Sequence, residues 1–339
     1  MLTNARNGAR KKGASTSLTG DDIVAAWRTI ESRVRRTPTV SHRLLSRRFG
    51  SPVYVKLENN QTFGSFKLRG WLSVFARLDE DERRGGIVTC AHGEHVRPLA
   101  AAAEQFGVAY RRVVAAEPGS GPRPVRANEV VVEASDATAL ERAAHELAER
   151  SGARYVDPST EPAWIAGVGS VGFELIEQAG QAPDVVFVPV GTGALATGIA
   201  IAIKSVRPQT RICGVQVEAG GNTARDGTLN LAAELAGRRS EAAEGRLDEL
   251  IDQRITVREA DLHDAIRTYA ETLRQAASGA GAAALAGARQ VRDRLGSACI
   301  GVILSGGNID VSTLRRVLDG EPAEDSTDEL RELVGQVYR

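Results

Sequence analysis

The chain has 339 residues, of which 42% are hydrophobic and 25% charged, and 43 basic and 43 acidic residues give it a formal net charge of +0. Binding of nucleic acid needs a basic footprint or aromatic stacking platforms, and only 4% of this chain is aromatic. The richest apolar stretch, residues 194–203, is shorter than the roughly 18 residues of a membrane helix. We therefore expect neither a nucleic-acid-binding protein nor a membrane protein.

The cysteines also limit the possible classes of protein. Cys90, Cys213 and Cys299 are odd in number and widely spaced, so they form neither a disulfide framework nor a metal-binding knuckle. This usage indicates a reducing compartment, and we predict a cytoplasmic protein.

The two ends of the chain differ in composition from the middle. Residues 1–17 are basic and polar without the apolar stretch of a secretory signal, and they are predicted to be a disordered tail. Residues 326–339 are predicted to include a C-terminal helix. Near the start, Thr19 followed by Asp21 and Asp22 is typical of a helix N-terminus.

Apolar strands and amphipathic helices then alternate along the chain. The predicted strands cover residues 53–57, 86–89, 108–115, 129–133, 155–156, 185–190, 211–217 and 299–304. The predicted helices cover residues 65–76, 98–106, 137–151, 165–179, 195–206, 259–274 and 280–295, and residues 311–318 close the core. The prolines and glycines of 117–126 argue against a helix there. This alternation predicts an α/β fold with mostly parallel sheets.

Three glycine-rich segments could bind a ligand or carry reactive groups. Gly191-Thr192-Gly193 follows a strand and precedes a helix, whose N–H groups could cradle a phosphate, although a turn without a ligand is an equal alternative. Ser305-Gly306-Gly307-Asn308 places a hydroxyl where α/β sheets bind ligands, or simply caps a turn. Lys67 lies near a helix N-terminus beside Phe66. A neutral amine there can attack a carbonyl, but a solvated lysine is the ordinary alternative.

Taken together, these segments resemble a known family. Lys56-Leu57-Glu58-Asn59 and Gly64-Ser65-Phe66-Lys67-Leu68-Arg69-Gly70 are similar to the cofactor-lysine segment of the serine/threonine dehydratase and serine racemase family of pyridoxal-phosphate enzymes. Further matches lie at residues 165–172, 188–191, 281–286 and 305–308. The resemblance implies a two-domain, tryptophan-synthase-β-like fold (fold type II). It implies a large cofactor-binding domain of residues 18–85 and 150–325 and a small mobile domain of residues 86–149.

The resemblance also implies roles for individual residues. Lys67 would hold pyridoxal 5'-phosphate as a Schiff base and remove the substrate α-proton. Phe66 would pack on the cofactor ring, and Ser305 would hydrogen-bond its pyridine nitrogen. The phosphate would bind to the turn formed by Gly191, Thr192, Gly193, Ala194 and Leu195. The substrate would contact Ser65, Ala91, His92, Gly93 and His95.

The substrate loop departs from the family pattern Ser-x-Gly-Asn-His. Ala91 lacks a hydroxyl that helps to bind the substrate carboxylate. Glu94 replaces an Asn that hydrogen-bonds the cofactor's phenolic oxygen, so its carboxylate must be protonated, displaced or paired with a cation, for which Arg97 and His95 are candidates. His92 stands where the racemases have a serine as second acid/base, and a solvated loop histidine is the alternative.

The expected activity is removal of the β-hydroxyl and the amino group of a hydroxy amino acid, which gives a 2-oxo acid and ammonia. A non-standard substrate of specialised metabolism is included in this expectation. Three alternatives stay open: a β- or γ-replacement enzyme, a racemase or epimerase using Lys67 and His92, and a cofactor-binding protein without activity. We predict an amino acid as the small-molecule substrate, a homodimer and no metal site.

Overall fold

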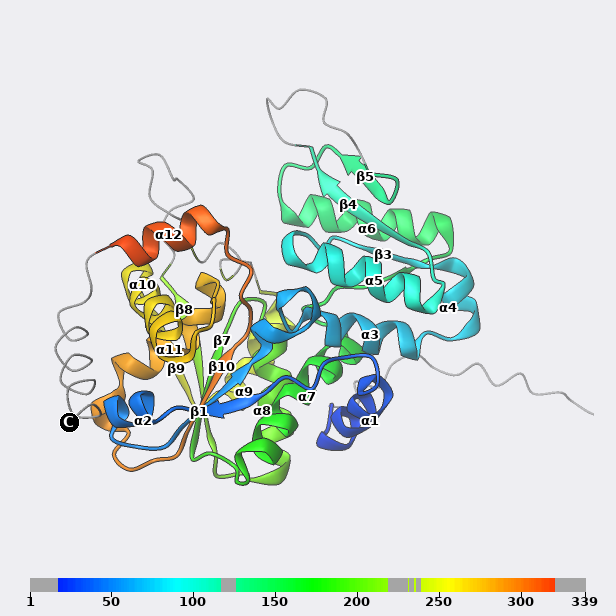
Figure 1. Ribbon diagram of the computed structural model, residues 1–339. Helices are drawn as coiled ribbons and strands as arrows, with labels where there is room; N and C mark the ends of the chain where they lie inside the picture. The colour runs from blue at the N-terminus through cyan, green and yellow to red at the C-terminus, as the bar shows by residue number, and fades with distance from the viewer. Residues whose placement is uncertain (1–17, 117–125, 219–230, 232–234, 236–238, 321–339) are drawn as a thin grey trace, which may run out of the picture.

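The computed structural model describes residues 18–116, 126–218, 231, 235 and 239–320 (Figure 1). The predicted tail at residues 1–17, the predicted C-terminal helix at 326–339 and most of the proline-containing segment 117–126 lie outside these residues. Within the described chain, no helix is both long and apolar enough to cross a membrane.

The described strands form two sheets, which occupy different regions of the molecule in Figure 1. The six-stranded sheet has the order β1-β2-β10-β7-β8-β9 and is parallel except for the antiparallel pair β1–β2. Its strands are β1 (Thr39–Ser41), β2 (Val53–Leu57), β7 (Val185–Pro189), β8 (Arg211–Val217), β9 (Gln253–Val257) and β10 (Ile300–Leu304). The four-stranded sheet, β5-β4-β3-β6, is parallel throughout. Its strands are β3 (Ile87–Thr89), β4 (Tyr110–Ala115), β5 (Glu129–Val132) and β6 (Arg154–Tyr155). The predicted α/β class with mostly parallel sheets is confirmed.

Helices cover both faces of the six-stranded sheet. The helices are α1 (Gly20–Ile30), α2 (Arg43–Phe49), α3 (Lys67–Arg77), α4 (Glu80–Gly85), α5 (Val96–Phe106), α6 (Ala137–Ser151), α7 (Pro162–Ala179), α8 (Ala194–Val206), α9 (Glu241–Leu250), α10 (Glu259–Thr268), α11 (Gly279–Gln290) and α12 (Val311–Asp319). Side chains alternate across a strand, so Val186 and Val188 of β7 face the core that α7 and α8 cover, whereas Val185 and Phe187 face the core under α10 and α11. The continuously apolar sequence of β7 follows from this double burial.

Helix α7 packs closely on α3 because a glycine lies at their contact. A Cβ at Gly167 would lie 2.5 Å from the backbone oxygen of Arg69, which no side chain tolerates. Helix packing therefore explains the glycine at position 167, and no role in ligand binding is needed to account for it.

Several predicted boundaries are wrong where long-range pairing overrides local preference. The helix predicted from Ser65 begins at Lys67, because Ser65 is extended and pairs with Gly306 in an antiparallel bridge. The helix predicted over 259–274 changes after Thr268 into a π-helical turn that ends at Arg274 with φ +57°. The sequence pattern does not indicate the elements α2, α4, α9, β1 and β9, since all are short or polar.

The predicted domain boundaries stay a prediction. The four-stranded sheet comes mainly from the predicted small segment 86–149, but its fourth strand, β6 at Arg154–Tyr155, lies beyond residue 149.

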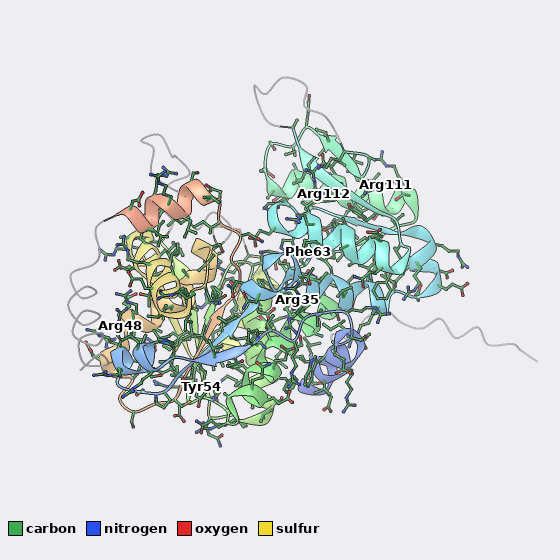
Figure 2. All side chains as sticks on the ribbon, in the orientation of Figure 1. Arg35, Arg48, Tyr54, Phe63, Arg111 and Arg112 are labelled. Carbon is green, nitrogen blue, oxygen red and sulfur yellow. The ribbon has the colours of Figure 1, made fainter. Side chains whose placement is uncertain are left out.

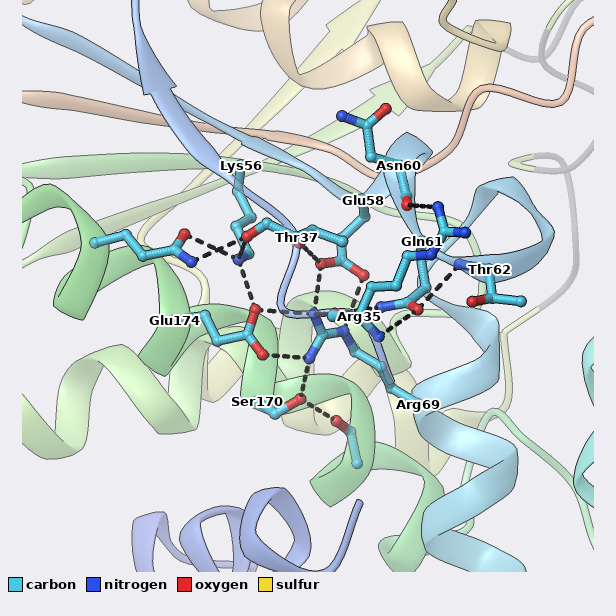
Figure 3. A network of polar contacts seen from close by, with 12 residues as sticks. Arg35, Thr37, Lys56, Glu58, Asn60, Gln61, Thr62, Arg69, Ser170 and Glu174 are labelled. Atoms are coloured by element: carbon cyan, nitrogen blue, oxygen red, sulfur yellow. Dashed lines mark hydrogen bonds and ion pairs between the residues drawn. The ribbon is translucent and has the colours of Figure 1, made fainter. Parts of the chain in front are cut away.

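A buried cluster of four charges joins β2, α3 and α7 (Figure 3). Lys56, Glu58, Arg69 and Glu174 are each no more than 1% exposed. The Arg69 guanidinium donates to both carboxylates, at 2.9 Å to Glu58 Oε1 and Oε2 and at 2.7 Å to Glu174 Oε1. The Lys56 ammonium donates to Glu174 Oε2 at 2.6 Å. Two positive and two negative charges therefore balance inside the protein, as buried ions require.

The environment of this charge cluster shifts the pKa values of Lys56, Arg69 and Glu174, and the shifts of Arg69 and Glu174 favour the charged forms. Burial lowers the pKa of Lys56, although the nearby carboxylates counteract this effect. Burial alone would lower the pKa of Arg69 and raise that of Glu174, but the opposite charges outweigh it and shift both pKa values the other way. Glu174 therefore adds stability at neutral pH, and this stability is lost as the pH falls through its depressed pKa.

Replacing Glu174 by Gln should destabilise the fold by about 3–5 kcal/mol, because Lys56 and Arg69 would then share one buried carboxylate. Urea unfolding measures this loss. The matched control is Glu177→Gln in the same helix, whose ion pair with Arg36 is half-exposed and should contribute less than about 1 kcal/mol. Equal losses in the two variants would contradict the importance of the cluster.

Candidate active site

A pocket lies at the carboxyl ends of β7 and β10, where the six-stranded sheet meets the loop that follows β3. Parallel α/β sheets commonly bind ligands at this edge. The pocket is lined by Phe66, Lys67, His92, Gly93, Glu94, His95, Trp164, Pro189, Gly191, Thr192, Gly193, Leu195, Leu235, Ser278, Ala280, Ser305 and Gly306. These residues come from segments that lie far apart in the sequence.

Lys67 is the first residue of α3, and its side chain is held within the pocket. Its Nζ atom lies 2.5 Å from Glu94 Oε2 and 5.2 Å from the centroid of the Phe66 ring. The side chains of Lys67 and Glu94 are each only 10% exposed. The lysine is therefore an ion-paired ammonium in a largely enclosed environment.

Backbone pairing brings Lys67 beside Ser305. The Phe66 N–H donates to the Ser305 carbonyl at 3.3 Å, and the Gly307 N–H donates to the Gly64 carbonyl at 2.9 Å. Phe63 has φ +70°, an uncommon left-handed conformation for an aromatic residue, and this turn redirects the chain just before the lysine. The strained turn and the bridge together place the amine next to the end of β10.

The glycine turn before α8 has the properties of an anion cradle. Helix α8 spans 13 residues and begins after Gly193, which provides no side-chain cap for the first N–H groups. These donors and the positive end of the helix dipole favour an anion at this position. Gly193 has φ +93°, and a Cβ there would lie 2.9 Å from Leu247 Cδ1, so the turn requires glycine.

Arg112 of β4 fixes the start of the loop that follows β3. The buried Arg112 side chain donates to the Ala91 carbonyl at 2.9 Å and pairs with Glu129 of β5. The Ala91 N–H donates to Thr89 Oγ1 at 3.1 Å, so both backbone groups of this residue are held. Arg112 thus anchors the loop carrying His92 and Glu94, and its neighbour Arg111, also labelled in Figure 2, is exposed.

The expected partners of Glu94 are wrong. Glu94 pairs with Lys67, whereas the Arg97 guanidinium lies over the Phe63 ring. His95 stacks on Trp164 and makes an edge contact with Trp71. Burial, with lesser contributions from Lys67 and His92, holds the pKa of His95 well below its usual value, so a neutral imidazole cannot balance a carboxylate.

The structure brings most of the candidate residues into this one pocket. Three of them do not line it: Ser65, Ala91 and Ala194 are buried beside it. His92 lines the pocket but is exposed, with Nδ1 3.4 Å from the Cys90 carbonyl. The sequence does not predict the remaining lining residues, because their positions depend on helix and loop packing; they are Trp164, Pro189, Leu235, Ser278 and Ala280.

The pocket fits a phosphorylated aldehyde such as pyridoxal phosphate. It combines an amine, an uncapped helix N-terminus and the hydroxyl residue Ser305. Three buried polar atoms in or beside it have no hydrogen-bond partner among the described residues, namely Ser65 Oγ, Glu94 Oε1 and His95 Nδ1. Such atoms are typical of a site that a polar ligand completes.

Known proteins resemble this chain over most of its length. The family model described as "Pyridoxal-phosphate dependent enzyme" matches residues 30–306. An L-threonine ammonia-lyase from Thermotoga maritima is 33% identical over 326 residues, covering 89% of this chain and 78% of the relative. A serine racemase from Schizosaccharomyces pombe is 29% identical over 86% of this chain and 95% of its own length. The structure of maize serine racemase matches with a TM-score of 0.75 and 28% identity, covering 87% of this chain and 96% of that chain. The predicted fold type is confirmed.

Replacing Arg112 by Met should weaken amino acid binding by roughly tenfold or more while cofactor content stays unchanged, because a buried hydrogen bond from a charged group contributes about 1.5–3 kcal/mol. Titration of amino acids against the visible absorbance of the cofactor measures this affinity. The control is the exposed neighbour, Arg111→Gln. An affinity in Arg112→Met equal to that of the control would contradict the anchoring role.

Replacing Gly193 by Ala should weaken cofactor binding by roughly tenfold, since the added Cβ displaces the turn and forces an L-residue into a conformation that costs about 1–3 kcal/mol. Cofactor affinity follows from absorbance titration of the stripped protein. Gly180→Ala at the end of α7 is the matched control, because its φ is +70° but nothing lies within 4 Å of the added Cβ. The cradle would be misassigned if both variants bound the cofactor like the parent.

Proposed function

Because the chain belongs to the family of pyridoxal-phosphate dependent enzymes, we propose that it is an ammonia-lyase acting on a β-hydroxy amino acid. The observation that carries this proposal is the convergence of Lys67, the Gly191–Gly193 turn and Ser305 on one pocket. The ammonia-lyase relative, at 33% identity, favours elimination over the other fates of such substrates.

The side chains around the pocket have distinct tasks in this proposal. When bound, the cofactor supplies an electron sink for the negative charge that develops at the substrate α-carbon. Lys67 Nζ would hold the cofactor and take the α-proton, the turn before α8 would hold the phosphate, and Ser305 would hydrogen-bond the ring nitrogen. Phe66 would pack on the ring. Trp164 and His95 line the pocket and stack on each other, which would limit the access of water.

The reaction conserves all atoms of the amino acid and water. The α-proton and the β-hydroxyl leave together as water, and water later replaces the amino group. The products are a 2-oxo acid and ammonia. Ala91 offers no hydroxyl for the substrate carboxylate, and we therefore propose that the substrate is a non-standard hydroxy amino acid.

One observation supports a second candidate, amino acid racemisation. His92 lines the same pocket as Lys67, and a serine racemase is among the relatives. An imidazole can both accept and donate a proton, so His92 could act as a second acid/base beside Lys67.

We further propose a homodimer in the cytoplasm and closure of a small domain, residues 86–149, over an amino acid substrate. Support for closure comes from the loop of residues 91–95, which contributes residues 92–95 to the pocket and is anchored to the four-stranded sheet through Arg112.

The proposal predicts that borohydride reduction of the full-length protein leaves a pyridoxyl group on Lys67, identified by mass spectrometry of the digest. The Lys67→Ala variant should lose this adduct and all turnover, whereas Lys204→Ala in α8 should retain both. Incubation with serine, threonine and related amino acids should release 2-oxo acid and ammonia in equal amounts. Solvent deuterium in an inverted amino acid would instead support a racemase, and turnover that needs a second nucleophile would support a replacement enzyme.

A further inference from the structure

Glu94 makes a direct contact with the amine of Lys67 in the pocket. Its Oε2 atom lies 2.5 Å from Lys67 Nζ, the distance of a charge-assisted hydrogen bond. Both side chains are 10% exposed, so solvent screens their attraction little. The Phe66 ring, 5.2 Å from the same ammonium, adds a favourable cation–π contact. The structure therefore holds the Lys67 nitrogen in a direct ion pair with Glu94.

A protonated amine cannot form a bond to an aldehyde, because its nitrogen has no free electron pair. Capture of the cofactor requires Lys67 to lose one proton and to leave Glu94. The lysine nitrogen then forms a C=N bond to the aldehyde carbon, and the aldehyde oxygen leaves with two protons of the ammonium as water. The third proton goes to the Glu94 carboxylate, which is in direct contact, so charge and atoms balance.

We propose that Glu94 competes with the cofactor for Lys67, which makes cofactor capture slower and weaker in this chain than with a neutral side chain at position 94. The inference rests on the proposed role of Lys67. An uncharged amide side chain at position 94 could not hold an ammonium by charge. A carboxylate at position 94 therefore affects loading of the enzyme in addition to any effect on the substrate.

Among its described surroundings, Lys67 is the group that compensates the charge of the Glu94 carboxylate. Its second oxygen, Oε1, is buried and has no hydrogen-bond partner among the described residues. His95, the adjacent residue, is held neutral by its burial between two tryptophans. Loss of the Lys67 contact would leave a poorly compensated buried carboxylate, unless that carboxylate takes up the proton that the lysine gives up. The packing around position 94 therefore couples transfer of a proton from Lys67 to Glu94 with capture of the cofactor by Lys67.

The test measures capture itself, independently of turnover. Full-length protein stripped of cofactor is mixed with pyridoxal phosphate, and the visible absorbance gives the rate and the affinity. We expect Glu94→Gln to capture the cofactor roughly tenfold faster and to bind it roughly tenfold more tightly, a ratio that corresponds to about 1.4 kcal/mol. The cofactor-free variant should also melt at a lower temperature than the parent, because its lysine has lost an ion pair. Glu94→Asn provides a second variant if the glutamine is poorly folded.

Glu104→Gln is the matched control, since Glu104 is an exposed residue of α5, the helix directly after the same loop. It should capture the cofactor like the parent. Capture by Glu94→Gln and Glu94→Asn that is no faster than the control overturns the inference, and it leaves the proposed function intact if the parent still carries the pyridoxyl adduct on Lys67. A parent without that adduct overturns both.

Discussion

The buried cluster of Lys56, Glu58, Arg69 and Glu174 is the constraint on which the pocket depends. Its members come from β2, the turn after β2, α3 and α7, so it joins the first part of the large sheet to the helices that cover it. Buried ions tolerate little displacement, because an unpaired charge in this environment is strongly unfavourable. Arg69 lies two residues after Lys67 in the first turn of α3. The cluster consequently fixes the helix end from which the reactive amine projects, without touching the pocket.

The pocket itself combines a rigid side with an adaptable one. The glycine turn before α8, the end of β10 and the segment before α3 are joined by backbone hydrogen bonds and close packing, which leave little freedom. The loop of residues 91–95 approaches from the four-stranded sheet and is held through Arg112. The segments around Lys67, Gly191 and Ser305 that match the family lie on the rigid side, whereas the departures Ala91, His92 and Glu94 lie on this loop. The division is physically reasonable, because cofactor binding needs a preorganised site and substrate choice can change with a loop.

The partner of Glu94 in the folded chain differs from the partners expected from the sequence. As an isolated substitution it introduces a repulsive carboxylate, and a cation nearby in the chain is the natural partner to expect. In the folded chain Arg97 contacts Phe63, His95 is neutral and the partner is the lysine of the cofactor site. Glu94 is therefore in direct contact with Lys67, the amine on which the proposed reaction depends.

Local sequence determined the class of fold, the doubly buried strand β7, the helix α6 and the three chemically important segments, because periodicity, capping residues and glycine spacing act over a few residues. It also indicated the family, since the motif around Lys67 keeps its residue types in order. Tertiary structure alone decided that α3 begins at Lys67, that Arg112 holds Ala91 and that Glu94 pairs with Lys67. These contacts join residues 241, 21 and 27 positions apart, respectively. Such pairs form only when separate elements pack together, so neither local preference nor motif order can specify them.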